Sequence, residues 1–416
     1  MFFTIRGVRM NILLLGNGFD LYHKLPTRYD NFLHTVNFLI NSYTKEMTTI
    51  ADIFGQEKLQ AENKFIAECY MQHKEVYEHI SLDEEKIKEI KALTKDNIWF
   101  SYLLQSFNKA VGWIDLEREI SFVIEAFKEF FATPNLQFNF MRKMPSPGYR
   151  YVIEKFDFFL APIISTGIVN GPTHKVKPEY TITIPVNSKN TLIDKEKIIS
   201  ELSKGLDDVT KALRLYLQCF IENSLYGIKE KSLNKCNAIV YIDKAITFNY
   251  TSSYEIFYLH DSIYHLHGNI NKRIILGINP DESDKLETVD TSFVKFKKYF
   301  QRTQYNTDRD YINWMNGLTE PKEFTTLLVM GHSLDITDKD IIIELFRKMD
   351  EINILYHSEE AKSIYISNLI KMFGKEEFDK LRKERKLTFL SLNSDFSDFI
   401  KKREQSSMEK IIGSFL

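Results

Sequence analysis

The chain has 416 residues, of which 44% are hydrophobic and 27% are charged, as in globular proteins that bury a real core. The formal net charge of −2 excludes a strong field for nucleic acid or an anionic membrane surface, so we expect neither as a partner. No apolar run approaches the roughly 18 residues of a membrane span, and the opening "MFFTIRGVRM" lacks the long apolar region of a signal peptide.

The first residues with strand character are 11–16, a continuous apolar run typical of a strand buried on both faces. Residues 30–128 then place apolar side chains three and four apart, which predicts helices. Residues 133–190 are rich in Pro, Gly and Asn and are predicted to be irregular, with "TITIPV" (181–186) as a short edge strand broken by Pro185. Helical spacing returns at 194–224.

The last third of the chain alternates between short β-branched or aromatic runs and helices. Strands are predicted in "AIVYIDKAITFNYT", "SIYHLHGNI", "KRIILGIN", "TTLLVMGHSL", "EINILYHS" and "LTFLSL", with helices in "TDKDIIIELFRKM", "EEAKSIYISNLIKMFG" and "EEFDKLRKERK". This alternation predicts an α/β fold with a parallel, doubly wound, Rossmann-like sheet. We therefore predict that residues 1–30 and 235–416 assemble one nucleotide-binding domain and that residues 31–234 are a helical insertion after the first strand.

Three cysteines, Cys69, Cys219 and Cys236, lie far apart, and none belongs to a Cys-x-x-Cys pair. This spacing argues against a zinc ribbon and against a disulfide framework. We expect no zinc or other metal site, and we expect a reducing cytoplasmic location.

The loop "GNGFD" follows the first strand. Gly16 and Gly18 would let the backbone approach a phosphate, and the helix that follows would offer free N–H groups. The alternative is an ordinary strand-to-helix turn with Asp20 as its N-cap. Read alone, the short motif leaves both interpretations open.

Two further strand ends carry polar side chains. Thr247, Asn249 and Thr251 end one strand, where an Asn carboxamide can bind a ribose hydroxyl or hold a water, or else cap the next helix. In "IYHLHGN" the alternation predicts that His265 and His267 share a face. A histidine there can act as a general base or be a buried, hydrogen-bonded core residue.

The fourth feature is "GHSLDITDKD". Thr337 and Asp340 have the spacing of a capping box, which makes Asp338 and Asp340 helix-end acids, while Gly331 and Ser333 are left to meet a phosphate or ribose.

The stretch "GNGFDLYHKLPTRYDNF" closely resembles the opening motif of the AbiH family of bacterial abortive-infection proteins, and "TFNYT", "HLHGN", "GHSLDITD" and "NILYHSEEAKSIYISNLIKMFG" resemble its later parts, with residues 113–117 as a further landmark. AbiH proteins are similar in turn to the sirtuin (SIR2-like) superfamily. Four sirtuin patterns are matched in the same order. Gly-Ala-Gly-x-Ser with a later Pro is matched by Gly16, Gly18 and Pro26, and Thr-Gln-Asn-x-Asp is matched by Thr247, Asn249 and, imperfectly, Thr251. His-Gly is matched by His267 and Gly268, and Gly-Thr-Ser-Leu is matched by Gly331, Ser333 and Leu334.

The resemblance implies an NAD pocket in which His267 is the general base and Asn249 contacts the nicotinamide ribose and orders a water. It implies that the nucleotide is lined by Gly16, Asn17, Gly18, Phe19, Asp20, Pro26, Thr247, Thr251, Gly268, Gly331, His332, Ser333 and Asp335. Scattered cysteines argue against a zinc-bearing deacylase, so hydrolysis of NAD during phage defence fits better. Asp20, Lys24 and Thr251 depart from the sirtuin pattern inside this pocket.

Two alternatives stay open. One is a nucleotide-binding sensor without turnover that signals to a partner. The other is a metal-dependent nuclease using Asp20, Asp335 and Asp338, which the neutral net charge disfavours. The basic stretch "KFKKYFQR" (295–302) is predicted to be a solvated helix face. A homo-oligomer and a phage-derived trigger are conceivable partners that the sequence does not identify.

Overall fold

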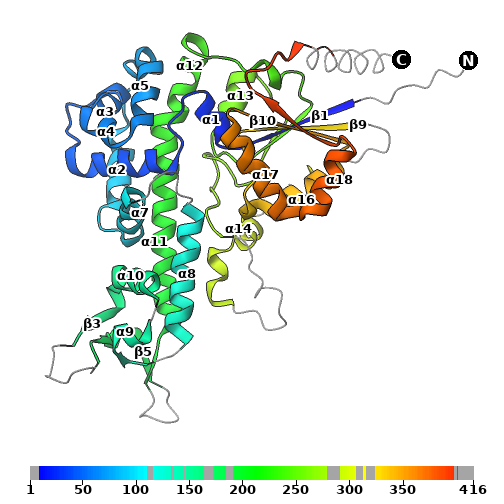
Figure 1. The fold of residues 1–416 in the computed structure, drawn as a ribbon. Coiled ribbons are helices and arrows are strands. Elements are labelled where there is room, and N and C mark those ends of the chain that lie inside the picture. The colour runs from blue at the N-terminus through cyan, green and yellow to red at the C-terminus, as the bar shows by residue number, and fades with distance from the viewer. Residues whose placement is uncertain are drawn as a thin grey trace, which may run out of the picture. The chain divides into compact units, whose positions relative to one another are not determined.

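In the computed structural model, the described residues are 9–109, 116–132, 135–144, 146–163, 172–183, 191–278, 291–305, 313–314, 324–397 and 401. Their largest sheet has six parallel strands in the order β11-β10-β9-β1-β7-β8 (Figure 1). The strands are β1 (Arg9–Leu15), β7 (Lys244–Thr247), β8 (Ile263–His265), β9 (Phe324–Met330), β10 (Glu351–Tyr356) and β11 (Leu387–Ser391). The predicted mixed α/β architecture with a parallel sheet is confirmed.

The sheet is apolar on both faces. Ile12 and Leu14 of β1 pack into a core cluster with side chains of α16 (Lys339–Lys348), α17 (Glu359–Phe373) and α18 (Lys375–Lys383), drawn in orange in Figure 1. Leu13 and Leu15 point to the opposite face because side chains alternate along a strand, and they are also fully buried. A continuous apolar run in β1 follows from this double burial.

The predicted helical stretch contains α2 (Tyr29–Ser42), α3 (Ile50–Phe54), α4 (Glu57–Glu62), α5 (Lys64–Tyr77), α6 (Glu84–Thr94), α7 (Ile98–Lys109) and α8 (Leu116–Ala132). Later helices are α9 (Phe140–Lys143), α10 (Pro147–Lys155), α11 (Lys195–Tyr216), α12 (Leu225–Lys231), α13 (Ser253–Tyr258) and α14 (Lys298–Gln304). Two small antiparallel sheets pair β2 (Gln137–Phe138), β4 (His174–Val176) and β3 (Leu160–Pro162), and β5 (Thr181–Thr183) with β6 (Thr191–Ile193).

Two predictions about elements were wrong. Residues 133–190 were predicted to be irregular, but residues 147–155 form α10, whose Ser146 N-cap accepts a hydrogen bond from the Tyr149 amide. "KRIILGIN" was predicted to be a strand, but within its described residues only Ile278 takes part in β pairing, as an isolated bridge to Lys297. Its apolar side chains Ile274, Ile275 and Leu276 are buried without sheet pairing, so burial alone explains the pattern.

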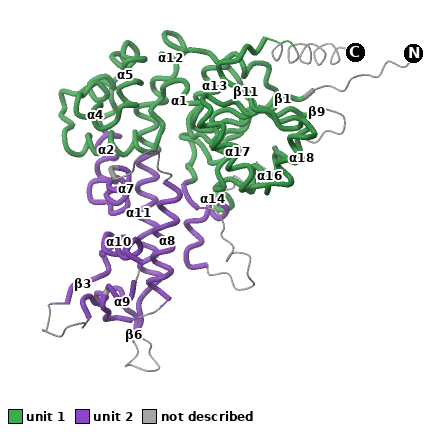
Figure 2. The backbone as a smooth tube through the Cα atoms, viewed as in Figure 1, with its two compact units in different colours: residues 1–84, 214–275, 302–416 green, residues 85–213, 276–301 purple. Residues whose placement is uncertain are grey.

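The chain divides into two compact units (Figure 2). Residues 1–84, 214–275 and 302–416 form the first unit, and residues 85–213 and 276–301 form the second. The first unit contains the whole six-stranded sheet. It also takes in residues 31–84 and 214–234, which the sequence assigns to the helical insertion, so the predicted domain boundaries do not coincide with this division. Among the described residues, we find no helix with both the length and the apolar character needed to cross a membrane.

Candidate functional site at the carboxyl edge of the sheet

The loops after β1 and β9 touch each other through their backbones. The Gly16 amide donates to the Met330 carbonyl at 3.1 Å, and the Gly18 amide donates to the Gly331 carbonyl at 2.8 Å. A Cβ on Gly16 would lie 2.6 Å from the Cα of His332, and one on Gly18 would lie 2.7 Å from the Cα of Gly331. Close packing of two loops therefore accounts for both glycines, and both amides already have protein acceptors.

The rest of the first loop is built on α1 (Gly18–Tyr22), which begins after Asn17, so Asp20 lies inside this helix and is not its N-cap. Asn17 exchanges hydrogen bonds with Thr27, whose hydroxyl donates to the Asn17 Oδ1 at 2.6 Å. Phe19 is fully buried. The Pro26 carbonyl accepts from the Tyr216 hydroxyl at 2.7 Å. The conformation of this loop is thus stabilised by contacts of Asn17, Phe19 and Pro26.

Lys24 has a left-handed backbone with φ of 54°, a conformation in which glycine is otherwise common. Its ammonium lies 2.6 Å from the carboxylate of Glu68, and both side chains are exposed. In this structure Lys24 is therefore a surface ion-pair partner.

Asp20 links the first strand end to the second. Its carboxylate is buried and accepts hydrogen bonds from the hydroxyls of Thr251, at 2.8 Å, and Ser253. Burial raises the pKa of Asp20 to about 6; the Ser253 and Thr251 hydroxyls oppose the shift, Glu255 adds to it and Asn249 slightly lowers it. Asp20 therefore titrates close to neutral pH.

Two more carboxyls gather near Asp20. The Glu222 carboxylate accepts from the Ser252 amide at 2.6 Å, and burial raises its pKa to about 7. Glu255 lies 2.6 Å from the Nε2 of His265. Burial alone would lower the pKa of His265, but Glu255 outweighs it, and the pKa is raised. His265 is therefore a buried histidine that pairs with a carboxylate. This agrees with the alternative of a buried, hydrogen-bonded histidine that the sequence left open.

Asn249 follows β7 and is only 7% exposed. Its amide donates to the Thr247 hydroxyl at 3.0 Å, which explains the buried Thr247 side chain. Both carboxamide atoms, Oδ1 and Nδ2, are buried and make no hydrogen bond of standard geometry, although the carboxamide interacts with the Asp20 carboxylate and lowers the pKa of Asp20. A carboxylate can accept only from Nδ2, so the buried Oδ1 lacks a donor, which a ligand hydroxyl or a water would supply.

His267 lies beyond the end of β8 and is 4% exposed. Its Nε2 is 3.6 Å from the Oδ1 of Asp338, while the Nε2 of His332 is 3.5 Å from the Oδ2 of the same residue. The ring of Phe248 contacts both imidazoles, with centroid distances of 5.2 Å to His267 and 4.2 Å to His332. Because β8 ends at His265, the predicted shared face of the two histidines is not maintained, and each contacts different groups.

Gly268 and Gly331 both have positive φ, of 74° and 71°. A Cβ on Gly268 would lie 2.0 Å from the Arg273 carbonyl oxygen, and one on Gly331 would lie 2.2 Å from the Phe19 nitrogen. Both glycines are thus required by a left-handed turn in crowded surroundings, whether or not a ligand binds.

The predicted capping box of Thr337 and Asp340 was wrong. Asp335 instead caps the short turn, its carboxylate accepting from the Thr337 amide at 3.3 Å, and Asp340 pairs with Arg302 at 3.1 Å. The Ser333 carbonyl accepts from Asn368 at 3.1 Å.

The structure thus brings most predicted residues to the carboxyl ends of neighbouring strands β9, β1, β7 and β8. It divides them into a hydroxyl–carboxyl group around Asp20 and a histidine group around His267. Asn249 connects the two groups, because its side chain interacts with Asp20 and its neighbour Phe248 touches both histidines. Sequence reasoning missed Asp338 as the partner of the histidines, although it lies only six residues after His332.

The metal-nuclease alternative gains nothing from the geometry. Asp20 contacts hydroxyls, Asp335 caps a turn and Asp338 contacts histidines, and no group of three His, Cys, Asp or Glu suited to a metal occurs in the part of the chain that the structure describes. The expectation for "KFKKYFQR" was also wrong, since Lys297, Lys298 and Arg302 are buried.

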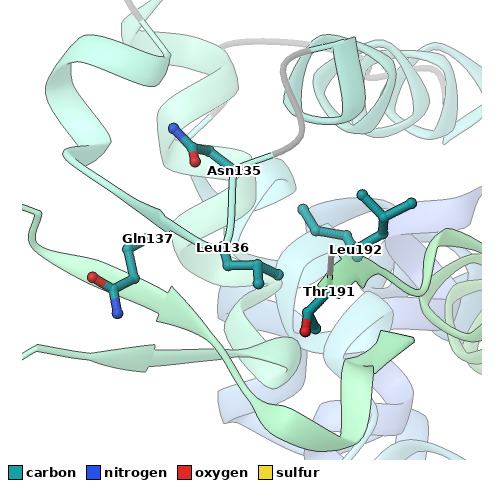
Figure 3. A pocket seen from close by; sticks show the side chains of 6 residues that line it. Asn135, Leu136, Gln137, Thr191 and Leu192 are labelled. Atoms are coloured by element: carbon teal, nitrogen blue, oxygen red, sulfur yellow. The ribbon is translucent and has the colours of Figure 1, made fainter. Parts of the chain in front are cut away.

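One surface cavity lies elsewhere, in the second unit (Figure 3). Its volume is about 360 Å³, and its lining residues are Asn135, Leu136, Gln137, Thr191, Leu192 and Ile193. None of these side chains is ionisable, so this cavity has no acid–base chemistry to offer.

The family model for bacteriophage abortive infection AbiH matches residues 12–359. Among curated proteins, none matches the chain. The matched span includes the four strand ends described above.

Proposed function

The chain belongs to the bacteriophage abortive infection AbiH family, and on this premise we propose that it acts in anti-phage defence by binding NAD at the carboxyl edge of its sheet and hydrolysing the nicotinamide–ribose bond. The alternative reading as a sensor without turnover differs only in the last step, and the experiment below separates the two.

The observation that carries this proposal is the buried Oδ1 of Asn249, which accepts no hydrogen bond, while the Nδ2 side of the carboxamide faces Asp20. A ribose hydroxyl can donate to this oxygen, and a water can do the same. Either would remove the free-energy cost of burying the oxygen without a partner.

The position of Asn249 in the sheet supports the same assignment. Numbered along the chain, the six strands have the spatial order 3-2-1-4-5-6, with β1 and β9 adjacent where the order reverses. In open parallel sheets of this order, dinucleotides bind in the crevice at that reversal point. Strands β1, β7 and β9 end at this edge, and the loops that follow them carry Gly16, Asn249 and His332.

The chemistry needs few groups. The bond between ribose C1′ and the nicotinamide nitrogen breaks, the bonding electrons leave with nicotinamide, and a water oxygen bonds to C1′. His267 takes the proton released by this water, and Asn249 orients the water or the ribose hydroxyls. The products are nicotinamide and ADP-ribose.

The test measures NAD in phage-infected cells that express the protein, together with NAD binding by the purified protein. We expect infection to deplete NAD with the wild type and not with His267→Ala or Asn249→Ala, a loss of activity of about 100-fold or more. Asp340→Asn is the matched control, because it removes a half-exposed acid outside the site whose partner is Arg302, and this variant should cleave NAD like the wild type. NAD should also raise the Tm of the purified wild type but not of Asn249→Ala.

Thermal stabilisation by NAD without any product would support the sensor instead. If infected cells keep their NAD and the purified protein shows no stabilisation, NAD is not the ligand and the proposal is wrong.

A further inference from the structure

Asp338 stands between two buried histidines. Its Oδ1 faces the Nε2 of His267 at 3.6 Å, and its Oδ2 faces the Nε2 of His332 at 3.5 Å. The Asp338 side chain is 13% exposed, and the two imidazoles are 5% and 4% exposed. Charge interactions act more strongly in such surroundings than in open water.

The protonation of His332 follows from its other nitrogen. The Leu334 amide donates a hydrogen bond to the Nδ1 of His332 at 2.9 Å, so this nitrogen must be an acceptor. The proton of the neutral imidazole is then on Nε2, the atom that faces Asp338. His332 therefore offers an N–H to one carboxylate oxygen and leaves the negative charge of Asp338 in place.

The second oxygen of Asp338 acts on His267. We propose that Asp338 is the positioning residue of this site: steadied by His332, it orients the imidazole of His267 and stabilises the imidazolium that forms when His267 takes a proton. This inference rests on the proposed function for the identity of the reaction. The contact itself does not depend on NAD being the substrate.

The two distances place each imidazole beside one carboxylate oxygen. At 3.5 and 3.6 Å both contacts are longer than a direct hydrogen bond, and a small movement of Asp338 would bring either within hydrogen-bond distance. A carboxylate that holds a histidine base in its orientation contributes to turnover more than to substrate binding.

The experiment compares the wild type with Asp338→Asn, Asp338→Glu and the control Asp340→Asn. For NAD cleavage, we expect Asp338→Asn to lower kcat by about 100-fold with KM changed less than about threefold. Asp338→Glu keeps the charge and should restore part of the rate, and Asp340→Asn should match the wild type. Nuclear magnetic resonance of ¹⁵N-histidine-labelled protein should show that the Nε2 proton of His267 is favoured in the wild type and loses this preference in Asp338→Asn.

The two readouts separate the two proposals. If the wild type leaves NAD intact, the proposed function fails, while the ¹⁵N spectra still decide whether Asp338 controls His267. Unchanged His267 signals and a kcat within about twofold in Asp338→Asn would overturn the positioning role. If Asp338→Asn does not fold, His332→Ala removes the group that steadies Asp338, and the same loss of His267 Nε2 protonation is expected. Its persistence would also overturn the role.

Discussion

At the scale of single residues, three positions of the predicted pocket, Asp20, Lys24 and Thr251, were expected to differ from a sirtuin pattern. Asp20 and Thr251, two of the three, are the two ends of one 2.8 Å hydrogen bond. The third, Lys24, points to Glu68 at the surface. The changed positions thus amount to one buried contact and one exposed ion pair, and only the contact lies beside Asn249.

Asp20 makes the stability of the fold depend on pH. Its pKa of about 6 in the folded protein lies above the ordinary 3.8, so the folded state binds this proton more tightly than the unfolded chain. Asp20 therefore lowers stability above pH 6, and this cost disappears as the pH falls from about 6 toward 4. Between pH 7.5 and pH 5 the gain in unfolding free energy from this group is about 1 kcal/mol.

Asp20→Asn should remove that gain, because the amide keeps the shape and loses the titration. Urea denaturation of wild type and variant at pH 5 and pH 7.5 measures the difference. The same pH dependence in both proteins would show that Asp20 is already ionised at pH 5. The neighbouring Glu222 has a pKa raised to about 7, mainly by burial and in part by the Asp20 charge, so its own titration changes in Asp20→Asn. The comparison is therefore made with Glu222→Gln in both proteins, which leaves Asp20 as the group that differs.

At the scale of elements, the contact between the loops after β1 and β9 explains why Gly16, Gly18 and Gly331 have no side chain. Gly331 and Gly374 both have positive φ, but a Cβ on Gly331 would lie 2.2 Å from the Phe19 nitrogen, while Gly374 has open space around it. Gly374→Ala should cost only the backbone strain, about 1–3 kcal/mol. Gly331→Ala should exceed this cost by about 2 kcal/mol or more, because the loops must move apart.

Urea midpoints of the two glycine variants measure this difference. Equal losses would mean that the loops separate easily, and the glycines would then be better explained by a ligand that approaches the backbone.

The strands themselves were largely predictable. β9, β10 and β11 are short apolar runs between helices with clear three-and-four spacing, and both patterns are local. The failure at residues 272–278 has a physical reason. An apolar run such as Ile274, Ile275 and Leu276 indicates that these side chains are buried. Buried residues form a strand only where the backbone of a neighbouring strand is available for hydrogen bonds.

The contacts of the site were less predictable. Asp20 and Thr251 are 231 residues apart, and nothing in either local pattern connects them. Asp338 is the helix-end acid that the sequence predicts, since it is the N-cap residue of α16, but an acid near a helix start is common and does not indicate a contact with histidines. Its contact with His267 depends on how the β8 and β9 loops meet. Strand-end placement predicted which residues gather at the edge, but not which of them pair.

At the scale of the whole molecule, the predicted site residues all belong to the first compact unit, and the second unit contains a buried ion pair of its own. Its basic stretch is not a solvated face. The Lys298 ammonium lies 2.7 Å from the Glu117 carboxylate, with the side chains 1% and 11% exposed. A buried ion pair is costly to break, because loss of one partner leaves the other charge in surroundings of low polarity.

Lys298→Met should therefore destabilise the second unit by about 3–5 kcal/mol, and adding Glu117→Leu should restore most of the loss, since an apolar pair of similar size replaces the ionic one. Lys295→Met is the matched control, because Lys295 lies in the same stretch but is exposed. The fluorescence of Trp99, buried in this unit, reports its unfolding in a background with Trp113→Phe and Trp314→Phe. If Lys298→Met unfolds at the same urea concentration as Lys295→Met, the ion pair contributes nothing measurable. If the double variant stays as unstable as Lys298→Met, the unpaired charge of Glu117 is not the cause of the destabilisation. The lysine then stabilises the unit through packing of its aliphatic side chain.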